Sequence, residues 1–332
     1  MSSQRSGLEI IQEFIRTEYD LGEVGLPRHL ERAHQRRHQK LVVDTGAGRF
    51  LIKTYRRKPE VLDALRFQHR LSDHMHHNGL PVARIQAARS GKRIAEAETW
   101  AMELQAFVEG DSMPVNEETL AIAGDALGRF HVVCADVPCP DRDARMWRFS
   151  EAPRETFAEL YRKARSQRDP GRCDDCCNRI ALFLRDAAHA LSFEARNQLE
   201  TGLIHGDWHS GNLIFKGNKL AAIVDLEFAG DGCYLEDLAY AVSNLCIRTS
   251  TGPDRLAWRT DALLAAYQRH RSMAYTEELA LYYAVGIKQV ATVAYQLRHK
   301  ERVAGLDSAE WLFRLADQCG WLIAQAQRLR WR

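Results

Sequence analysis

The chain is 332 residues long and has 46 Lys and Arg residues against 44 Asp and Glu residues, a formal net charge of +2. This length suffices for one large domain or two closely packed lobes. Such a small net charge gives no global attraction to nucleic acid. No apolar run is long enough to span a membrane, and the first residues lack the pattern of a secretion signal. We therefore expect a cytoplasmic protein without a nucleic-acid or membrane partner; the sequence gives no indication of an oligomeric state.

Eight cysteines raise the question of disulfides or a metal site. Disulfide frameworks are typical of short secreted chains. Cys173, Cys176 and Cys177 form a CxxCC cluster that could bind zinc if another residue completed the ligand set, but no second CxxC pair exists. The candidates for completing the set are Cys134, Cys139 and His131. We expect reduced thiols in a helical segment and no structural zinc.

The first hundred residues predict a small sheet with one crossover helix. Two β-rich runs flank a glycine turn and predict a hairpin, Lys40–Thr45 and Arg49–Tyr55. Helical spacing predicts one helix over residues 8–19 and another that starts at Pro59 and ends at Asn78-Gly79. Further strands are expected over residues 82–87 and 99–105.

The pattern becomes mainly helical after Gly110. Asn116 is a good N-cap for a helix with an apolar face, and Asp307 opens a capping-box pattern before the last helix. Residues 141–172 predict a loop with a short helix, and residues 175–199 a longer helix. We therefore expect an α+β protein, with a β-rich N-terminal lobe over residues 1–104 and a larger helical lobe over residues 105–332.

Side chains capable of chemistry are concentrated in residues 203–232, LIHGDWHSGNLIFKGNKLAAIVDLEFAGDG. Asp207 and Asn212 precede one short strand of this segment, and Asp225 ends the next. A hairpin would therefore hold two carboxylates and an amide at one edge. Phosphoryl transfer needs such a set, because one carboxylate must orient the acceptor hydroxyl while a second carboxylate and an amide oxygen hold Mg²⁺. A lysine must also reach the phosphates, and Lys53 in the first hairpin is the natural candidate.

The pattern HxDxxxxN followed by a strand ending in Asp is similar to the catalytic and metal loops of eukaryotic-like kinases. The form HGDWHSGN resembles the aminoglycoside phosphotransferase and choline kinase superfamily, which includes type II homoserine kinases and the stress-response and spore-coat kinase-like proteins. RFLIKTY resembles the lysine strand of this superfamily, MELQAFVEG its hinge and LEDLAY the segment after its metal loop. The resemblance extends along most of the chain and implies a two-lobed, protein-kinase-like fold.

This resemblance implies a kinase that uses ATP and Mg²⁺ and a role for each matching residue. Asp207 would be the catalytic base, and Asn212 and Asp225 would bind the metal. Lys53 would contact the nucleotide phosphates. The backbone of the hinge, from Gln105 to Phe107, would face the adenine edge.

Four further residues near the motif have expected supporting roles. His205 would brace the catalytic loop by hydrogen bonds, and His209 would pack within it. Asp237 resembles a position that hydrogen-bonds the catalytic loop. Glu227 could approach the metal or could equally be a solvated carboxylate.

Two departures from kinases stand out. The first is in residues 30–40, where the resemblance places the hairpin turn that covers the phosphates; this segment contains no glycine. Arg36, Arg37 and Lys40 would either supply positive charge to the phosphates or form a solvated basic loop.

The second departure is that the helix position that usually carries the glutamate partner of the lysine holds Gln68. Glu60 and Asp63 lie upstream on the same helix. Eight residues separate Glu60 from Gln68, about 12 Å along a helix, which is too far for both to contact the same lysine. We therefore expect Gln68 to be the neighbour of Lys53 and a nucleotide-binding residue.

The leading hypothesis is a phosphotransferase that moves the γ-phosphate of ATP to a hydroxyl of a small molecule, such as an amino alcohol or amino sugar. Two alternatives stay open: a protein Ser/Thr kinase of the stress-response type, and a pseudokinase that acts as a binding or scaffold protein. The absence of an A-P-E motif after Asp225 favours a small acceptor.

Overall fold

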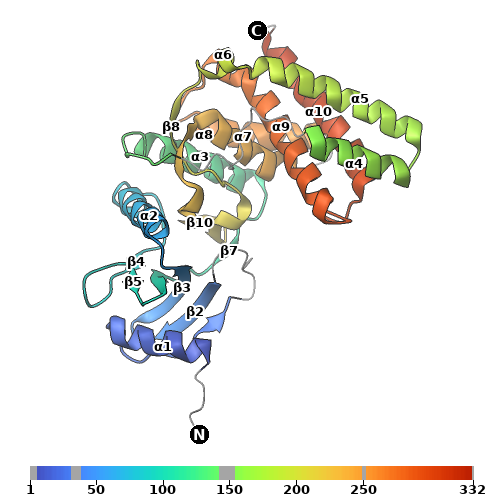
Figure 1. Ribbon diagram of the computed structural model, residues 1–332. Helices are drawn as coiled ribbons and strands as arrows, with labels where there is room; N and C mark the ends of the chain where they lie inside the picture. Colours follow the sequence, from blue (N-terminus) through green and yellow to red (C-terminus); the bar gives the residue numbers. More distant parts are fainter. Residues whose placement is uncertain (1–5, 31–38, 142–153, 249–251, 331–332) are drawn as a thin grey trace. The chain divides into compact units, whose positions relative to one another are not determined.

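The computed structural model describes residues 6–30, 39–141, 154–248 and 252–330, and its backbone forms two compact units (Figure 1). Unit 1 runs to Asp111 and also takes in residues 214–217 and 221–227. Unit 2 comprises the other described residues. The lobe boundary predicted after residue 104 stays a prediction.

Unit 1 is built on an antiparallel sheet in the order β1-β2-β3-β6-β4, with β5 paired to β6. Its elements are α1 Gly7–Glu18, β1 Arg28–His29, β2 Gln39–Thr45, β3 Gly48–Arg56, α2 Pro59–His77, β4 Ile85–Gln86, β5 Ala95–Glu96 and β6 Trp100–Ala106. The predicted hairpin is thus confirmed as β2 and β3, and the predicted helix from Pro59 as α2.

The two helices of unit 1 pack on opposite faces of this sheet. Ile11 and Ile15 of α1 join a buried core with Leu41 and Ile52. Side chains alternate along a strand, so Lys53 and its neighbour in register on β6, Glu103, belong to the other face. That face is covered by α2, whose Leu62 and Leu65 pack with Tyr55.

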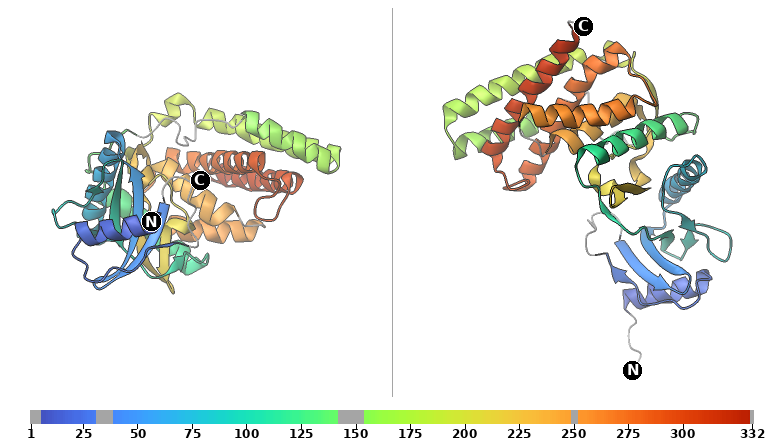
Figure 2. Two further views of the ribbon diagram at one scale, coloured as in Figure 1. Left: turned by 60° about the horizontal axis from the view of Figure 1, so that its bottom comes forward. Right: turned by 180° about the vertical axis from the view of Figure 1, so that it is seen from behind.

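Unit 2 is mainly helical, and Figure 2 shows its bundle from two further sides. Its helices are α3 Glu117–Val133, α4 Arg154–Gln167, α5 Pro170–Ala190, α6 Phe193–Arg196, α7 Tyr234–Ala241, the π-helix η3 Val242–Ile247, α8 Pro253–Tyr267, α9 Tyr275–His299 and α10 Ser308–Arg330. The 3₁₀ turns are η1 Ser210–Asn212 and η2 Leu226–Phe228, and the remaining strands are β7 Asp111–Ser112, β8 Thr201–Ile204, β9 Leu213–Lys216, β10 Lys219–Ile223 and β11 Gly230–Cys233. Parts of η2, β9 and β10 belong to unit 1.

The helix bundle of unit 2 has a long buried helix, α9, packed against α4, α5, α7 and α10. The predicted N-cap at Asn116 is confirmed, because its side chain accepts a hydrogen bond from the Thr119 N–H. The prediction of only a short helix before residue 172 was wrong: α4 has 14 residues. Its apolar stripe, Phe157, Leu160 and Ala164, is hidden among charged residues in the sequence.

The cysteine cluster lies on α5, which begins at Pro170 and not near residue 175 because Asp169 caps it. Cys173 and Cys176 are buried, and Cys177 is half-buried. No group of three or more His, Cys, Asp or Glu side chains in the described part of the chain could hold a metal ion. None of the described helices is long and apolar enough to cross a membrane.

Candidate active site

The loop that carries Asp207 begins where β8 ends. Strand β8 pairs with β11 in antiparallel register, Ile204 opposite Gly230, and this pairing fixes the backbone just before His205. Gly206 has φ of +78°, a conformation that favours glycine. The 3₁₀ turn Ser210–Asn212 then closes the loop, with the His209 imidazole capping it at the Gly211 N–H.

Three side chains surround the Asp207 carboxylate within unit 2. The Tyr240 hydroxyl donates to Oδ1, and Asn212 Nδ2 donates to Oδ2 at 3.0 Å. His209 Nε2 lies 3.3 Å from Oδ2. Burial would raise the pKa of Asp207, but the hydrogen bonds and charge of His209 and the bond from Tyr240 outweigh it and hold the pKa below its usual value. Asp207 is therefore ionised at neutral pH, as a proton acceptor must be.

Asp237 on α7 holds the start of this loop. Its carboxylate accepts the backbone N–H of His205 at 2.8 Å and of Gly206 at 3.0 Å. His131 Nε2 lies 3.1 Å from the same carboxylate, and His131 Nδ1 lies 2.8 Å from the Tyr267 hydroxyl. This fully buried network fixes the backbone that presents Asp207, which is the supporting role that the sequence predicts for Asp237.

In unit 1, Asp225 is joined to two lysines. Lys53 Nζ lies 3.3 Å from Oδ1, and Lys40 Nζ lies 2.9 Å from Oδ2. Asp225 has φ of +66°, a left-handed conformation that is uncommon outside glycine and occurs at functional sites. Burial would raise the pKa of Asp225, but the two ammonium groups lower it strongly. Arg36 and Arg37 lie outside the described residues, so Lys40 is the member of the basic loop that the structure places.

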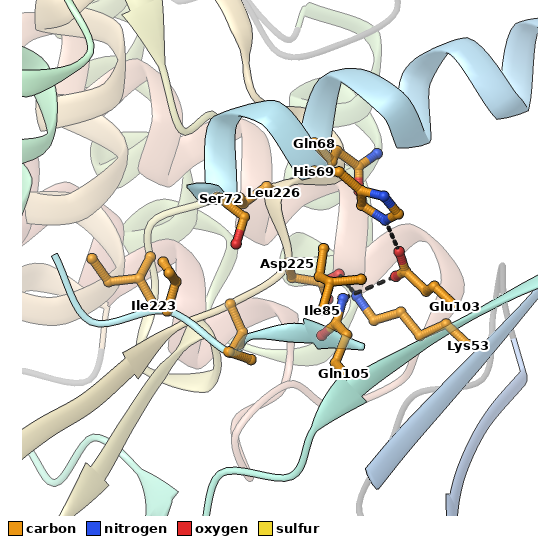
Figure 3. Close-up of a pocket in the computed structure, with 13 residues that line it drawn as sticks. Lys53, Gln68, His69, Ser72, Ile85, Glu103, Gln105, Ile223, Asp225 and Leu226 are labelled. Atoms are coloured by element: carbon orange, nitrogen blue, oxygen red, sulfur yellow. Dashed lines mark hydrogen bonds and ion pairs between the residues drawn. The ribbon is translucent and has the colours of Figure 1, made fainter. Parts of the chain in front are cut away.

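Lys53, Gln68 and Asp225 line one small polar pocket of unit 1 (Figure 3). Gln68 lies on α2 and lines this pocket, and its predicted contact with Lys53 stays a prediction. Glu60 and Asp63 instead pair with the exposed Lys58 and Arg66. The role of Gln68 toward a nucleotide likewise stays a prediction.

A buried acid that the sequence analysis missed, Glu103 on β6, lies in the same pocket. The side chains that donate to it are Tyr55 and Gln105, each at 2.9 Å, and it also hydrogen-bonds His69 of α2. Burial would raise the pKa of Glu103, but the bond from His69 and the charge of Lys53 keep the pKa below its usual value. Burial would likewise lower the pKa of Lys53, but Asp225 and Glu103 hold it above its usual value. Glu103 thus supplies the negative charge that Gln68 cannot.

Glu103 gives no local signal, because it lies beside Lys53 only through the pairing of β3 with β6, two strands far apart in the sequence. Tyr240 is the second residue missed, and it lies one turn beyond Asp237 on α7. A tyrosine within an apolar helix gives no signal in one sequence, since its usual role is packing.

The hinge segment is placed at the end of β6. Gln105 pairs with Leu51 on one side and with Ile85 on the other. The Phe107 N–H donates to the Arg49 carbonyl at 3.0 Å, so this donor is used within unit 1. The expected contact of Gln105 and Phe107 with an adenine stays a prediction.

A family model described as "Phosphotransferase enzyme family" matches residues 30–282, about three quarters of the chain. The chain belongs to the phosphotransferase enzyme family. Its relatives include homoserine kinase from Caulobacter sp. (strain K31), 28% identical over 281 residues, which span 80% of this chain and 78% of the relative. Homoserine kinase from Nitrobacter hamburgensis is 26% identical over 271 residues, 79% and 76% of the two chains.

Solved structures of other phosphotransferases and kinases share the fold. An aminoglycoside phosphotransferase from Alicyclobacillus acidocaldarius subsp. acidocaldarius matches with a TM-score of 0.68 at 17% identity, over 99% of this chain and 97% of that one. A microcompartment-associated aminopropanol kinase matches with a TM-score of 0.63 at 17% identity, over 97% and 99%. Amicoumacin kinase in complex with AMP-PNP and Ca²⁺ matches with a TM-score of 0.66 at 12% identity, over 95% and 93%.

These findings confirm the predicted kinase-like α+β fold and the phosphotransferase class. The protein is thus a phosphotransferase of the kinase class. The alternatives of a protein kinase and of a pseudokinase scaffold find no support among these relatives.

Proposed function

We propose that this phosphotransferase moves the γ-phosphate of ATP to a hydroxyl of a small amino alcohol, amino sugar or similar acceptor, with Mg²⁺ as the metal. The observation that carries the proposal is the ion pair between Lys53 and Asp225 in the polar pocket of unit 1. The two residues are 172 positions apart in the sequence, yet their side chains meet in one pocket. There Lys53 would bind a nucleotide phosphate and Asp225 the metal.

The residues present suit a metal–triphosphate group. Lys53 and Lys40 are cations that can move from the Asp225 carboxylate to phosphate oxygens, and Asp225 is an oxygen ligand of the kind Mg²⁺ prefers. In unit 2, the Asn212 amide nitrogen donates to Asp207, which leaves its oxygen available to a cation. Bound Mg²⁺ would neutralise charge on the phosphates.

Asp207 would orient the acceptor hydroxyl and take its proton. The carboxylate is ionised, and its two oxygens are held by Tyr240, Asn212 and His209. Fixed partners reduce the reorganisation that the carboxylate needs when the hydroxyl reacts. Asp237 maintains this geometry through the loop backbone.

A panel assay tests the proposal. Release of ADP from ATP with Mg²⁺ is measured with homoserine, 3-aminopropan-1-ol, choline, an aminoglycoside and a sugar, and the product is identified by mass spectrometry. We expect acceptor-dependent turnover with one class and its loss in Asp207→Asn. Turnover of no acceptor in the panel, or equal turnover in Asp207→Asn, would contradict the proposal.

A further inference from the structure

Lys40 on β2 and Lys53 on β3 lie directly opposite each other in the sheet of unit 1. Side chains at opposed positions of an antiparallel strand pair project from the same face and lie close together, and like charges there are destabilising. The strand register therefore brings two ammonium groups side by side, which is unfavourable unless an anion lies between them.

The carboxylate of Asp225 is that anion. Its Oδ2 lies 2.9 Å from Lys40 Nζ, and its Oδ1 lies 3.3 Å from Lys53 Nζ, so each oxygen faces one ammonium group. The Lys53 ammonium faces Asp225 inside the pocket (Figure 3). The Asp225 side chain is only 21% exposed, so water screens these charges less than it would at the surface. Both oxygens of the expected metal ligand thus already have a cationic partner.

The two lysines differ in how firmly they are held at Asp225. Lys53 is 7% exposed and lies beside a second acid, Glu103, its partner in register on β6. Lys40 is 23% exposed, and Asp225 is its one acidic partner among the residues that the structure describes. Glu103 is two strands away from Lys40 in the sheet. Lys40 is therefore the lysine that another anion can draw away from Asp225 more readily.

This arrangement bears on a divalent cation that approaches Asp225. A metal ion bound to the carboxylate would come within a few ångströms of both ammonium groups, and the repulsion between such charges is strong in a partly buried site. The phosphates of a nucleotide offer other oxygens to the Lys40 ammonium, and its transfer to them would leave Asp225 Oδ2 to the metal. The metal alone should therefore bind poorly, and the metal with a nucleotide should bind well.

We propose that Lys40 couples metal binding to nucleotide binding: it holds the metal-binding oxygen of Asp225 until a nucleotide arrives, and then moves to the phosphates. This inference rests on the proposed function, since it takes Asp225 as the ligand of the metal. Coupling between two ligands is reciprocal, so it can be measured from the metal side without any phosphoryl transfer.

Metal binding without nucleotide is the first measurement. Mn²⁺, which prefers the same oxygen ligands as Mg²⁺, is titrated into the full chain, and the free ion is measured by electron paramagnetic resonance. We expect Lys40→Gln to bind Mn²⁺ about tenfold more tightly than wild type, or about 1.4 kcal/mol, because one of the two repelling charges is removed. Lys40→Met is a second neutral variant and should show the same gain. Lys40→Arg keeps the charge and should bind Mn²⁺ as weakly as wild type.

Nucleotide binding is the second measurement, and its change should have the opposite sign. The affinity for AMP-PNP with Mg²⁺, measured by titration calorimetry, should fall about tenfold in Lys40→Gln, because the phosphates lose a cation. A purely structural role of Lys40 would lower both affinities or change neither. The control is Lys58→Gln, an exposed lysine of the same unit, which should keep both wild-type affinities. Thermal melting verifies that each variant is folded.

The gain in Mn²⁺ affinity must also depend on Asp225. It should disappear in the double variant Lys40→Gln with Asp225→Asn, and a gain that survives there would place the metal elsewhere and overturn the inference. Unchanged Mn²⁺ affinity in folded Lys40→Gln and Lys40→Met would overturn it as well, while the proposed kinase function, which the acceptor panel tests, would stand. If no acceptor of that panel is phosphorylated, the proposed function fails, and the Mn²⁺ titrations still decide whether Lys40 couples the two ligands.

Discussion

The imidazole of His69 on α2 hydrogen-bonds the carboxylate of Glu103 on β6, and both groups are buried, with 5% and 1% of their surface exposed. Figure 3 shows the two side chains facing each other, with Lys53 and Gln105 beside them. The helix thus contributes a histidine that fixes a strand acid, where kinases usually place the acid on the helix itself. Compared with the usual kinase arrangement, the negative charge beside Lys53 comes from a strand and not from the helix.

We predict that Glu103→Gln weakens ATP binding about tenfold, or about 1.4 kcal/mol. The amide keeps the volume but removes the charge that, with Asp225, holds Lys53 in place. Titration calorimetry with ATP and Mg²⁺ measures the effect, and thermal melting confirms folding. Glu60→Gln is the matched control, because that side chain is exposed and pairs only with Lys58 among the described residues. If Glu60→Gln lowers ATP affinity tenfold and Glu103→Gln does not, the acid that holds Lys53 is Glu60 and not Glu103.

The sequence predicted the hairpin, the helix from Pro59 and the capped helix after Asn116 because each depends on local signals: a glycine turn, a helix-starting proline and a capping side chain. Motif spacing predicted roles for Asp207, Asn212 and Asp225, and these roles stay predictions. Glu103 was missed because its role depends on pairing between distant strands.

Asp207→Asn and Asp225→Asn should each lower kcat/KM by about 10³-fold or more while the protein stays folded. The first change removes the proton acceptor, and the second weakens the hold on the metal and leaves Lys40 and Lys53 without their shared carboxylate. Steady-state kinetics with the best acceptor measures both. Asp63→Asn, on an exposed part of α2, should behave as wild type. Activity within tenfold of wild type in either active-site variant would remove that residue from the proposed mechanism.

Stability should fall on acidification, in part through His131. Burial lowers the pKa of this imidazole, against the opposing effect of Asp237. An unfolded histidine has a pKa of about 6.5, so below that pH unfolding takes up a proton and is favoured. The contribution of His131 is therefore complete above pH 6.5 or so and is lost as the pH falls toward the lower folded value.

Urea unfolding at pH 7.5 and pH 5.5 tests this prediction. The drop in unfolding free energy between the two pH values should be smaller in His131→Gln than in wild type, because the variant no longer takes up a proton at this position on unfolding. His76→Gln, an exposed histidine of α2, serves as the control. An identical drop in wild type and His131→Gln would show that His131 does not titrate on unfolding.

We also predict that the purified protein contains no stoichiometric zinc. Cys173 and Cys176 are buried on the core face of α5, and burial raises the pKa of both thiols, which disfavours the thiolate that zinc requires. Elemental analysis by mass spectrometry measures the metal. One equivalent of zinc that is lost in Cys173→Ser with Cys176→Ser would overturn the prediction.

The last prediction concerns the contact between α3 and α8 in unit 2. A methyl group at Gly124 would lie 2.1 Å from the backbone oxygen of Leu263, far inside van der Waals contact. Backbone cannot rotate away as a side chain can, so Gly124→Ala must push the two helices apart. Overpacking of this kind costs about 1–3 kcal/mol, against a gain of about 1 kcal/mol in helix propensity. Because the obstacle is backbone, we expect the cost to win and the melting temperature to fall by several degrees.

Gly171→Ala in the first turn of α5 is the matched control, since its methyl group would have only an ordinary contact at 3.5 Å with Asp169. It should melt at or slightly above the wild-type temperature, as expected for a helical glycine replaced where there is room. If Gly124→Ala melts as high as Gly171→Ala, the helices α3 and α8 do not pack as closely in solution as the backbone distance requires.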